Sequence, residues 1–255
     1  MGHVLKNRLL CLSAKTTILL LSVVFLFALT EVSAQRRFSR SYPASREVRL
    51  TLYNRSGTVT VQGWDRQQVQ VQAYLEAPAA SVNPQVVDGV ILINVVKDNY
   101  GRADIGSVNF NIRVPYDAIV DIETKIGNLN VSSVGGALVR AKISSDGDIT
   151  LTNISAHRVD AENGIGNIFF DGEIQANGTY RFTSMRGDIN LRVPLNSSFK
   201  LVATAPSTRS INLGSFANGK LRFVGDGRRV MGQFGDGNSS ITVTNQRGTI
   251  AFVRR

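Results

Sequence analysis

A short unit that begins with glycine recurs along the chain at nearly constant intervals. The unit follows Gly127, Gly147, Gly166 and Gly187, and consecutive glycines of this set are separated by similar numbers of residues. In every copy an aliphatic side chain stands two positions after the glycine, and a second apolar side chain stands four positions after it. The pairs are Leu129 with Val131, Ile149 with Leu151, Ile168 with Phe170, and Ile189 with Leu191. Because side chains alternate across a strand, both members of a pair point to the same face.

These pairs constrain the fold, because a short strand cannot bury two apolar side chains alone. Stacking the units buries the pairs in one column and joins neighbouring backbones. Glycine allows the positive φ of a tight corner, and the Asn or Asp after it suits such a turn. Second strands are predicted over residues 138–143, 158–161 and 180–183. We therefore predict an all-β fold, a β-solenoid or β-helix-like stack, with an antiparallel β-sandwich as the alternative.

The same signature appears near both ends of the chain, after Gly57 and after Gly248. The interval from Gly187 to Gly248 is close to the length of three further units. The interval from Gly57 to Gly127 does not divide evenly into such units. We expect the loop that follows Leu75 to absorb that difference.

The segment 1–34 has the pattern of an export signal. Basic residues precede the uncharged, mostly apolar run 16–29, and small residues end at Ala34. The run is shorter than the roughly 20 residues that span a bilayer. We predict that residues 1–34 are a signal peptide cleaved after Ala34. The alternative is an uncleaved anchor, which would be the chain's only contact with a membrane.

The rest of the chain is predicted to hold a basic lead-in and one domain. Residues 35–46 are polar and rich in arginine, so we predict a flexible segment there. Residues 47–255 are predicted to form the β-strand repeat domain. Cys11 is the only cysteine and precedes the apolar run. Disulfides are therefore excluded from the predicted mature chain, and its stability must come from burial and backbone pairing.

The residues give little sign of catalysis or of a cofactor. His157 is the only histidine after Ala34, and without cysteine it cannot form an ordinary zinc site. Carboxylates are available for glycoside chemistry, but their spacing selects no pair. They are Asp121, Glu123, Asp146, Asp148, Glu162 and Asp171. We expect no enzyme activity, no metal and no cofactor, and a β-helical polysaccharide lyase or hydrolase is the alternative.

Several short motifs together resemble a known family. They are the glycine-led units, the segment from Gly57 to Gly63-Trp64-Asp65, and the Val-Pro turns at Val114-Pro115 and Val193-Pro194. Over residues 48–255 the chain is similar to the DUF4097 family, bacterial adhesin-like proteins with β-strand repeats. The resemblance implies a β-solenoid fold and an adhesin-like role.

The charge indicates what a partner would carry. The formal net charge is +10, and arginines gather toward both ends of the chain. An exported basic protein meets anionic envelope polysaccharide more readily than nucleic acid. The candidate contacts are Arg36, Arg37, Arg40, Arg228 and Arg229, and the competing interpretation is a solvated face that discourages strand pairing.

We expect an exported, non-catalytic protein of the periplasm, cell surface or medium that binds or scaffolds envelope components. Its expected partner is an anionic envelope polysaccharide or another envelope protein, not nucleic acid. An accessory of envelope-stress signalling is a further alternative.

Overall fold

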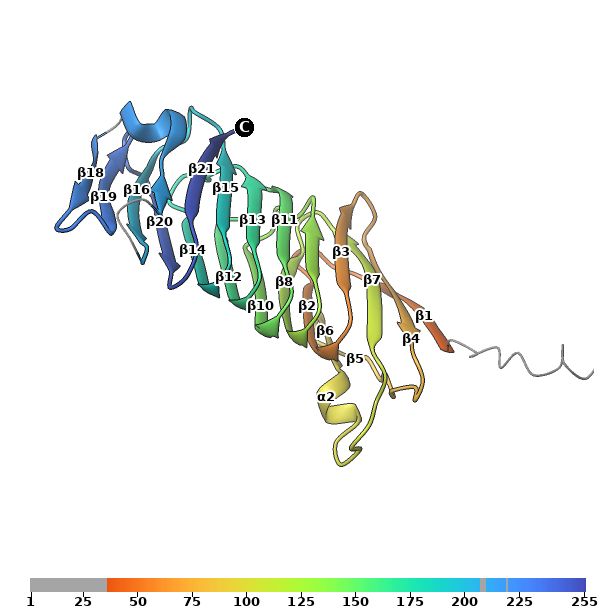
Figure 1. The fold of residues 1–255 in the computed structure, drawn as a ribbon. Helices are drawn as coiled ribbons and strands as arrows, with labels where there is room; N and C mark the ends of the chain where they lie inside the picture. Colours follow the sequence, from red (N-terminus) through yellow and green to blue (C-terminus); the bar gives the residue numbers. More distant parts are fainter. Residues whose placement is uncertain (1–35, 207–209, 219) are drawn as a thin grey trace, which may run out of the picture. The chain divides into compact units, whose positions relative to one another are not determined.

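The computed structural model describes residues 36–206, 210–218 and 220–255, which form two large β-sheets (Figure 1). The predicted cleavage site at Ala34 lies outside these residues. The first sheet has the strand order β1 (Arg36–Pro43), β4 (Gln68–Leu75), β7 (Val108–Pro115), β3 (Val59–Trp64), β9 (Leu129–Ser132), β11 (Ile149–Ile154), β13 (Ile168–Gly172), β15 (Ile189–Val193), β21 (Ile250–Arg254) and β17 (Ile211–Asn212). We call it sheet 1.

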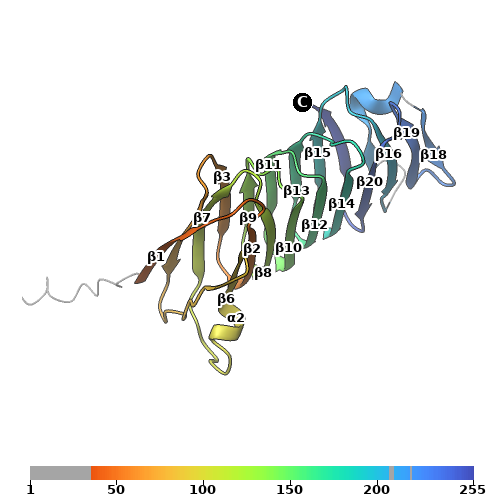
Figure 2. The same ribbon diagram turned by 180° about the vertical axis from the view of Figure 1, so that it is seen from behind.

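Sheet 2 has the strand order β18 (Lys220–Val224), β19 (Arg229–Phe234), β16 (Phe199–Thr204), β20 (Ser239–Asn245), β14 (Thr179–Arg186), β12 (Arg158–Ile165), β10 (Leu138–Asp146), β8 (Ile119–Ile126), β2 (Arg49–Ser56), β6 (Val90–Asn94) and β5 (Gln85–Val87). Figure 2 shows its central strands side by side. Two short helices lie outside the sheets, α2 (Val95–Asp98) and the 3-10 helix η1 (Gly214–Asn218). Within the described residues, no helix is long and apolar enough to cross a membrane.

Each coil of the stack contains one strand from each sheet. The chain passes along a strand of sheet 2, turns at a repeat glycine and continues along a strand of sheet 1, as from β10 to β11. Neighbouring coils pair in parallel and in register, with Leu129 opposite Ile149 and Ile149 opposite Ile168. The predicted all-β, solenoid-like stack is confirmed, and a sandwich of hairpins would not give this parallel register.

The core fills the space between the two sheets. The predicted pairs, from Leu129 and Val131 to Ile189 and Leu191, are all at most 1% exposed. Inward side chains of sheet 2, such as Val139, Ala141 and Phe182, are equally buried. Because successive coils bury their apolar pairs against each other, the core is one continuous cluster.

The six repeat glycines form one column at the corner between the sheets, which we call the glycine column. They are Gly57, Gly127, Gly147, Gly166, Gly187 and Gly248, with φ between 112° and 145°. A Cβ added to Gly147 would overlap the carbonyl oxygen of Gly127, and one added to Gly166 would overlap that of Gly147. The corner therefore excludes side chains both by its backbone conformation and by the close approach of neighbouring coils.

Each long interval between glycines contains one further coil, β6 with β7 and β16 with β17, so the length that fits three units after Gly187 does not correspond to three coils. Ile189 pairs directly with Ile250, which makes Gly187 and Gly248 neighbours in the column. Likewise Val59 pairs with Leu129. The intervening residues form the ends of the stack. Strands β4 to β7 extend one end, and β16 to β19 extend the other.

The prediction of a flexible lead-in over residues 35–46 is wrong for residues 36–43, which form β1. This strand pairs antiparallel with β4 along its whole length, from Arg36 opposite Leu75 to Pro43 opposite Gln68. Phe38 and Tyr42 are partly buried and pack against the core. Pairing with an otherwise open strand edge, together with two aromatic contacts, outweighs the polar and arginine-rich composition.

Tyr180 connects β14 to the loops that precede β12 and β14. Its hydroxyl donates a hydrogen bond to the Ala156 carbonyl at 3.0 Å and accepts one from the Gln175 amide at 2.7 Å. Burial raises the pKa of the Tyr180 hydroxyl above its ordinary value. The Gln175 hydrogen bond lowers this pKa, and the charge of Glu173 raises it.

Replacing Gly147 with Ala is expected to lower the free energy of unfolding by roughly 2–4 kcal/mol, through the left-handed backbone and the overlap with Gly127. Gly101→Ala is the matched control, because Gly101 has φ of 80° but no atom within 4 Å of an added Cβ. Urea denaturation followed by circular dichroism measures both variants. Equal losses in the two would contradict the close approach at the column.

Raising the pH above about 10 is expected to destabilise the fold through Tyr180. In the unfolded chain this hydroxyl ionises at its ordinary pKa, whereas in the folded protein it stays protonated until the pH reaches its raised pKa. Its contribution is therefore present below about pH 10 and lost as the pH rises, by at most about 1.4 kcal/mol per pH unit. Urea unfolding across this range should show a shallower decline for Tyr180→Phe than for the unmodified protein. Parallel declines would rule out this assignment.

Candidate functional site

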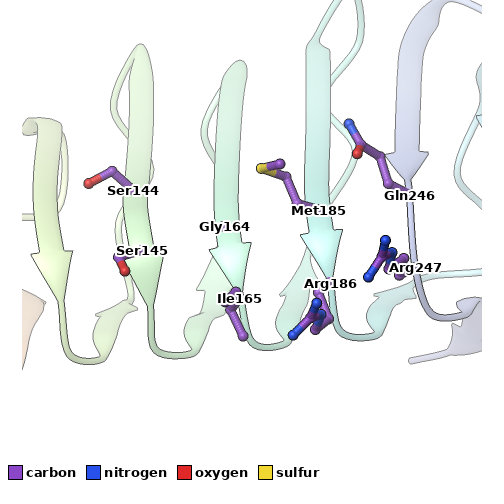
Figure 3. A pocket seen from close by; sticks show the side chains of 8 residues that line it. All are labelled: Ser144, Ser145, Gly164, Ile165, Met185, Arg186, Gln246 and Arg247. Atoms are coloured by element: carbon purple, nitrogen blue, oxygen red, sulfur yellow. The ribbon is translucent and has the colours of Figure 1, made fainter.

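A groove runs over the ends of four neighbouring strands of sheet 2, beside the glycine column (Figure 3). We call it the corner groove, and its cavity volume is about 370 Å³. Strands β10, β12, β14 and β20 each contribute residues near their ends. The lining residues are Ser144, Ser145, Gly164, Ile165, Met185, Arg186, Gln246 and Arg247. Arginine, apolar and small side chains thus meet at one place on the surface.

Two arginines from neighbouring coils lie side by side in this groove. Arg186 directly precedes Gly187, and Arg247 directly precedes Gly248. Their backbones are fixed by the corner, because Gly166 N–H donates to the Arg186 carbonyl at 2.8 Å and Gly187 N–H donates to the Arg247 carbonyl at 2.9 Å. Both side chains are exposed at the ends of β14 and β20 (Figure 3). Neither guanidinium forms an ion pair within the described part of the chain.

The groove is open because side chains are small or displaced on the two coils beside the arginines. Gly164 has no side chain, and a Cβ there would approach the Ser145 carbonyl oxygen to 2.6 Å. In β10 the register shifts between Ile143 and Asp146, which places an extra residue at the strand end. Exposed Ile165 and Met185 lie next to this opening and give the groove an apolar wall.

A row of buried polar side chains lies beneath the corner. At five of the six repeat glycines, one of these side chains stands three positions earlier in the chain. They are Asn54, Thr124, Asn163, Ser184 and Asn245, and all are at most 3% exposed. Asn163 Nδ2 donates to the Gly147 carbonyl at 2.8 Å, a group that the corner would otherwise leave unpaired. Ile143 occupies the equivalent register on β10, the strand with the extra residue.

Asn245 links this buried row to the groove. Its Nδ2 donates to the Gly187 carbonyl at 2.8 Å and to the Thr249 carbonyl at 3.0 Å. Its Oδ1 accepts the N–H of Arg247 at 3.0 Å. One buried amide therefore closes the turn that presents Arg247 and satisfies the carbonyl beside Arg186, so Asn245 is a positioning residue for the pair.

Two carboxylates lie near the arginine pair. Asp146 is opposite Ile165, which in turn is opposite Arg186, so Asp146 lies two strands away from Arg186. Asp188 follows Gly187, and its Oδ1 accepts hydrogen bonds from the N–H and the hydroxyl of Thr249, both at 2.8 Å. Since neither carboxylate comes within ion-pair distance of the two guanidinium groups, the positive charge of the groove stays available for an anionic ligand.

The arginines named from the sequence do not lie in this groove. Arg36, Arg37 and Arg40 lie on β1, at one end of the stack, while Arg228 and Arg229 lie at the β18–β19 hairpin at the other. Arg37 stacks over Tyr74 at 5.3 Å, Arg40 over Phe38 at 5.9 Å, and Arg228 pairs with Asp226 at 2.8 Å. Sequence reasoning missed Arg186. The signal was present as two Arg-Gly pairs, but the long interval between their glycines hid their adjacency.

The carboxylates considered for an enzyme are dispersed over both sheets. Asp121 pairs with Arg140 at 3.4 Å and Glu162 with Lys142 at 3.6 Å, on sheet 2. Asp171 lies on sheet 1 and pairs with Arg255 at 3.2 Å. His157 is exposed, in a depression that also includes Arg46, Glu47 and Asp117. Across residues 36–206, 210–218 and 220–255, no three His, Cys, Asp or Glu side chains gather as metal ligands would.

The family model of Toastrack DUF4097 matches residues 114–251, more than half of the chain. The chain belongs to this family. Its fold is similar to that of a Clostridium sporogenes ATCC 15579 protein named "putative cell adhesion protein", with a TM-score of 0.53 and 13% identity over 86% of this chain and 98% of that one. A "putative adhesin" from Bacteroides fragilis NCTC 9343 has a TM-score of 0.39 and 10% identity, over 88% of this chain and 99% of that one. No curated protein matches the sequence.

Replacing Asn245 with Leu is expected to lower the free energy of unfolding by about 1–3 kcal/mol, because the Gly187 and Thr249 carbonyl groups lose their donor. Asn111→Leu is the control, since Asn111 is exposed and its side chain forms no hydrogen bond within the described residues. Thermal and urea unfolding measure the difference. A variant as stable as the control would show that the buried amide does not support the corner.

Proposed function

We propose that this Toastrack protein is an exported, non-catalytic, adhesin-like module of the bacterial cell envelope that binds anionic polysaccharide. The observation that carries the proposal is the pair Arg186 and Arg247, which lie side by side in the corner groove without a carboxylate partner among the described residues. Guanidinium groups hold carboxylates through two parallel hydrogen bonds, so two of them on neighbouring coils suit a polymer with repeated acidic groups.

The apolar wall of the groove suits the sugar rings of such a polysaccharide. Ile165 and Met185 expose apolar surface beside the arginines. Sugar rings carry C–H groups on their faces as well as hydroxyl and carboxylate groups at their edges. A uronate unit can therefore place its carboxylate on Arg186 or Arg247 and a ring face on the apolar wall.

The location and the role are supported by three further observations. The N-terminal segment 1–34 has the pattern of a signal peptide. The net charge of +10 attracts anionic envelope polymers. The similar fold of a protein named for cell adhesion agrees with a binding role. The regular stack supplies a rigid support on which the groove is held.

The double variant Arg186→Gln with Arg247→Gln is expected to bind polygalacturonate at least about tenfold more weakly, because each lost charge-assisted hydrogen bond is worth about 1.5–3 kcal/mol. Isothermal titration calorimetry at moderate salt measures the change. The matched control is Arg228→Gln with Arg229→Gln, which removes the same charge at the β18–β19 hairpin.

Three results would count against the proposed function. The first is no binding of polygalacturonate by the unmodified protein. The second is an equal loss in both double variants, which would indicate net charge alone. The third is release of new reducing or unsaturated ends from the polymer, which would indicate an enzyme.

A further inference from the structure

The outer face of sheet 1 carries a second regular surface, unrelated to the corner groove. On five neighbouring strands, β4, β7, β3, β9 and β11, one outward position forms a row in register. The row consists of Gln72, Asn111, Thr60, Asn130 and Thr150. A parallel row two residues further along includes Gln62, Ser132 and Thr152, with Arg113 at its position on β7 and Asp171 at its position on β13. We call the eight uncharged side chains of the two rows the amide–hydroxyl face.

The absence of charge from the first row on these five strands is not a consequence of the chain's composition. The equivalent row on sheet 2 alternates in sign through Asp121, Arg140, Asp160 and Arg181. Its members pair with each other, as Arg140 does with Asp121. The two sheets come from the same repeating coil, yet one outer face carries a row of alternating charges and the other a row of neutral amides and hydroxyls.

The polar groups of the amide–hydroxyl face have few partners within the protein. Ser132 Oγ lies 3.5 Å from the Val61 carbonyl. For the other seven side chains, no hydrogen bond to the described protein is formed. Thr60, Asn130 and Thr150 are half-buried between their neighbours, which restricts their rotamers. Ordered donors and acceptors at the strand spacing of about 4.8 Å are therefore turned toward the solvent.

An aromatic ring lies at one end of the first row. Phe169 is directly opposite Thr150 on the outer face of sheet 1, and it is half-buried. Trp64, another aromatic side chain near this face, has Arg66 over its ring at 5.2 Å and Arg113 at 5.6 Å. The ring of Phe169 thus offers an apolar platform that continues the line of amides and hydroxyls.

We propose that the amide–hydroxyl face is a binding surface for a neutral, extended polysaccharide. Such a polymer carries hydroxyl groups, which both donate and accept hydrogen bonds, and amides and hydroxyls are the side chains that do the same without charge. A flat row across five strands suits a ribbon-like chain, and Phe169 suits the face of one sugar ring. The eight side chains carry no charge that would bind an anionic polymer, which distinguishes this face from the corner groove.

Sedimentation with microcrystalline cellulose tests this inference, at about 150 mM salt to screen non-specific attraction of the basic protein. The full protein is expected to leave the supernatant with the polymer. Thr150→Lys is expected to weaken retention at least tenfold, because it places a bulky charge between Asn130 and the ring of Phe169. Thr183→Lys is the matched control, since Thr183 is a half-buried outward residue of β14 on sheet 2, and it should be retained like the unmodified protein.

A conservative variant keeps the test valid if Thr150→Lys fails to fold. Thr150→Val with Thr152→Val preserves the shape of the side chains and removes two hydroxyls, and it should also reduce retention. Thermal unfolding of every variant verifies the fold. The variant Arg186→Gln with Arg247→Gln should bind cellulose like the unmodified protein, which separates this inference from the proposed function.

Failure of the unmodified protein to bind cellulose, or equal retention of the Thr150 and Thr183 variants, would overturn the inference. If cellulose binding disappears with the two groove arginines instead, the corner groove is the only site supported. Cellulose binding without polygalacturonate binding would support the amide–hydroxyl face as a binding surface and would contradict the proposed function.

Discussion

The structure depends on how closely the backbone of one coil approaches the next at the glycine column. In each corner a glycine with positive φ lies against a carbonyl group of the neighbouring coil. This approach sets the register of both sheets at once, because the strands on either side of the corner start from the same point. Once this register is set, the apolar pairs of successive coils lie opposite one another. The buried row below the column completes the arrangement, since Asn163 and Asn245 donate to carbonyl groups that a corner of this kind leaves open.

The sequence predicts the repeating part of the fold well, because the repeat rests on local patterns. Alternating apolar pairs and a glycine at each corner identify the coils, and the parallel stack follows from them. The ends of the stack could not be predicted in the same way. The segment between Gly187 and Gly248 has a length that fits three coils, yet it forms one coil, β16 with β17, together with the β18–β19 hairpin and a 3-10 helix. Its length is a numerical coincidence, and only strand pairing reveals that the two glycines are adjacent.

The candidate site escaped prediction for the same reason. Arg186 and Arg247 are ordinary surface arginines in the sequence, and they form a pair only because β20 lies beside β14. Arg36, Arg37 and Arg40 are close in sequence, but they lie on β1 at the edge of sheet 1, whereas the groove is formed by strands of sheet 2. For β1, a composition typical of a flexible segment was overridden by pairing with β4. A site built across coils is visible from the sequence only after the coils are aligned correctly.

The late insertion of β20 and β21 has a consequence for the synthesis of the protein. Strand β20 lies between β14 and β16, and β21 lies between β15 and β17, so the last strands of the chain occupy interior places in both sheets. Until they are made, β16 has no place beside the growing stack, and the coil that contains β14 and β15 keeps an open edge. The C-terminal strands therefore join two parts of each sheet instead of covering one end of the stack. A chain that stopped before Ser239 would lack the piece that joins its two parts, and a quality-control protease would meet two exposed sheet edges instead of one shortened end.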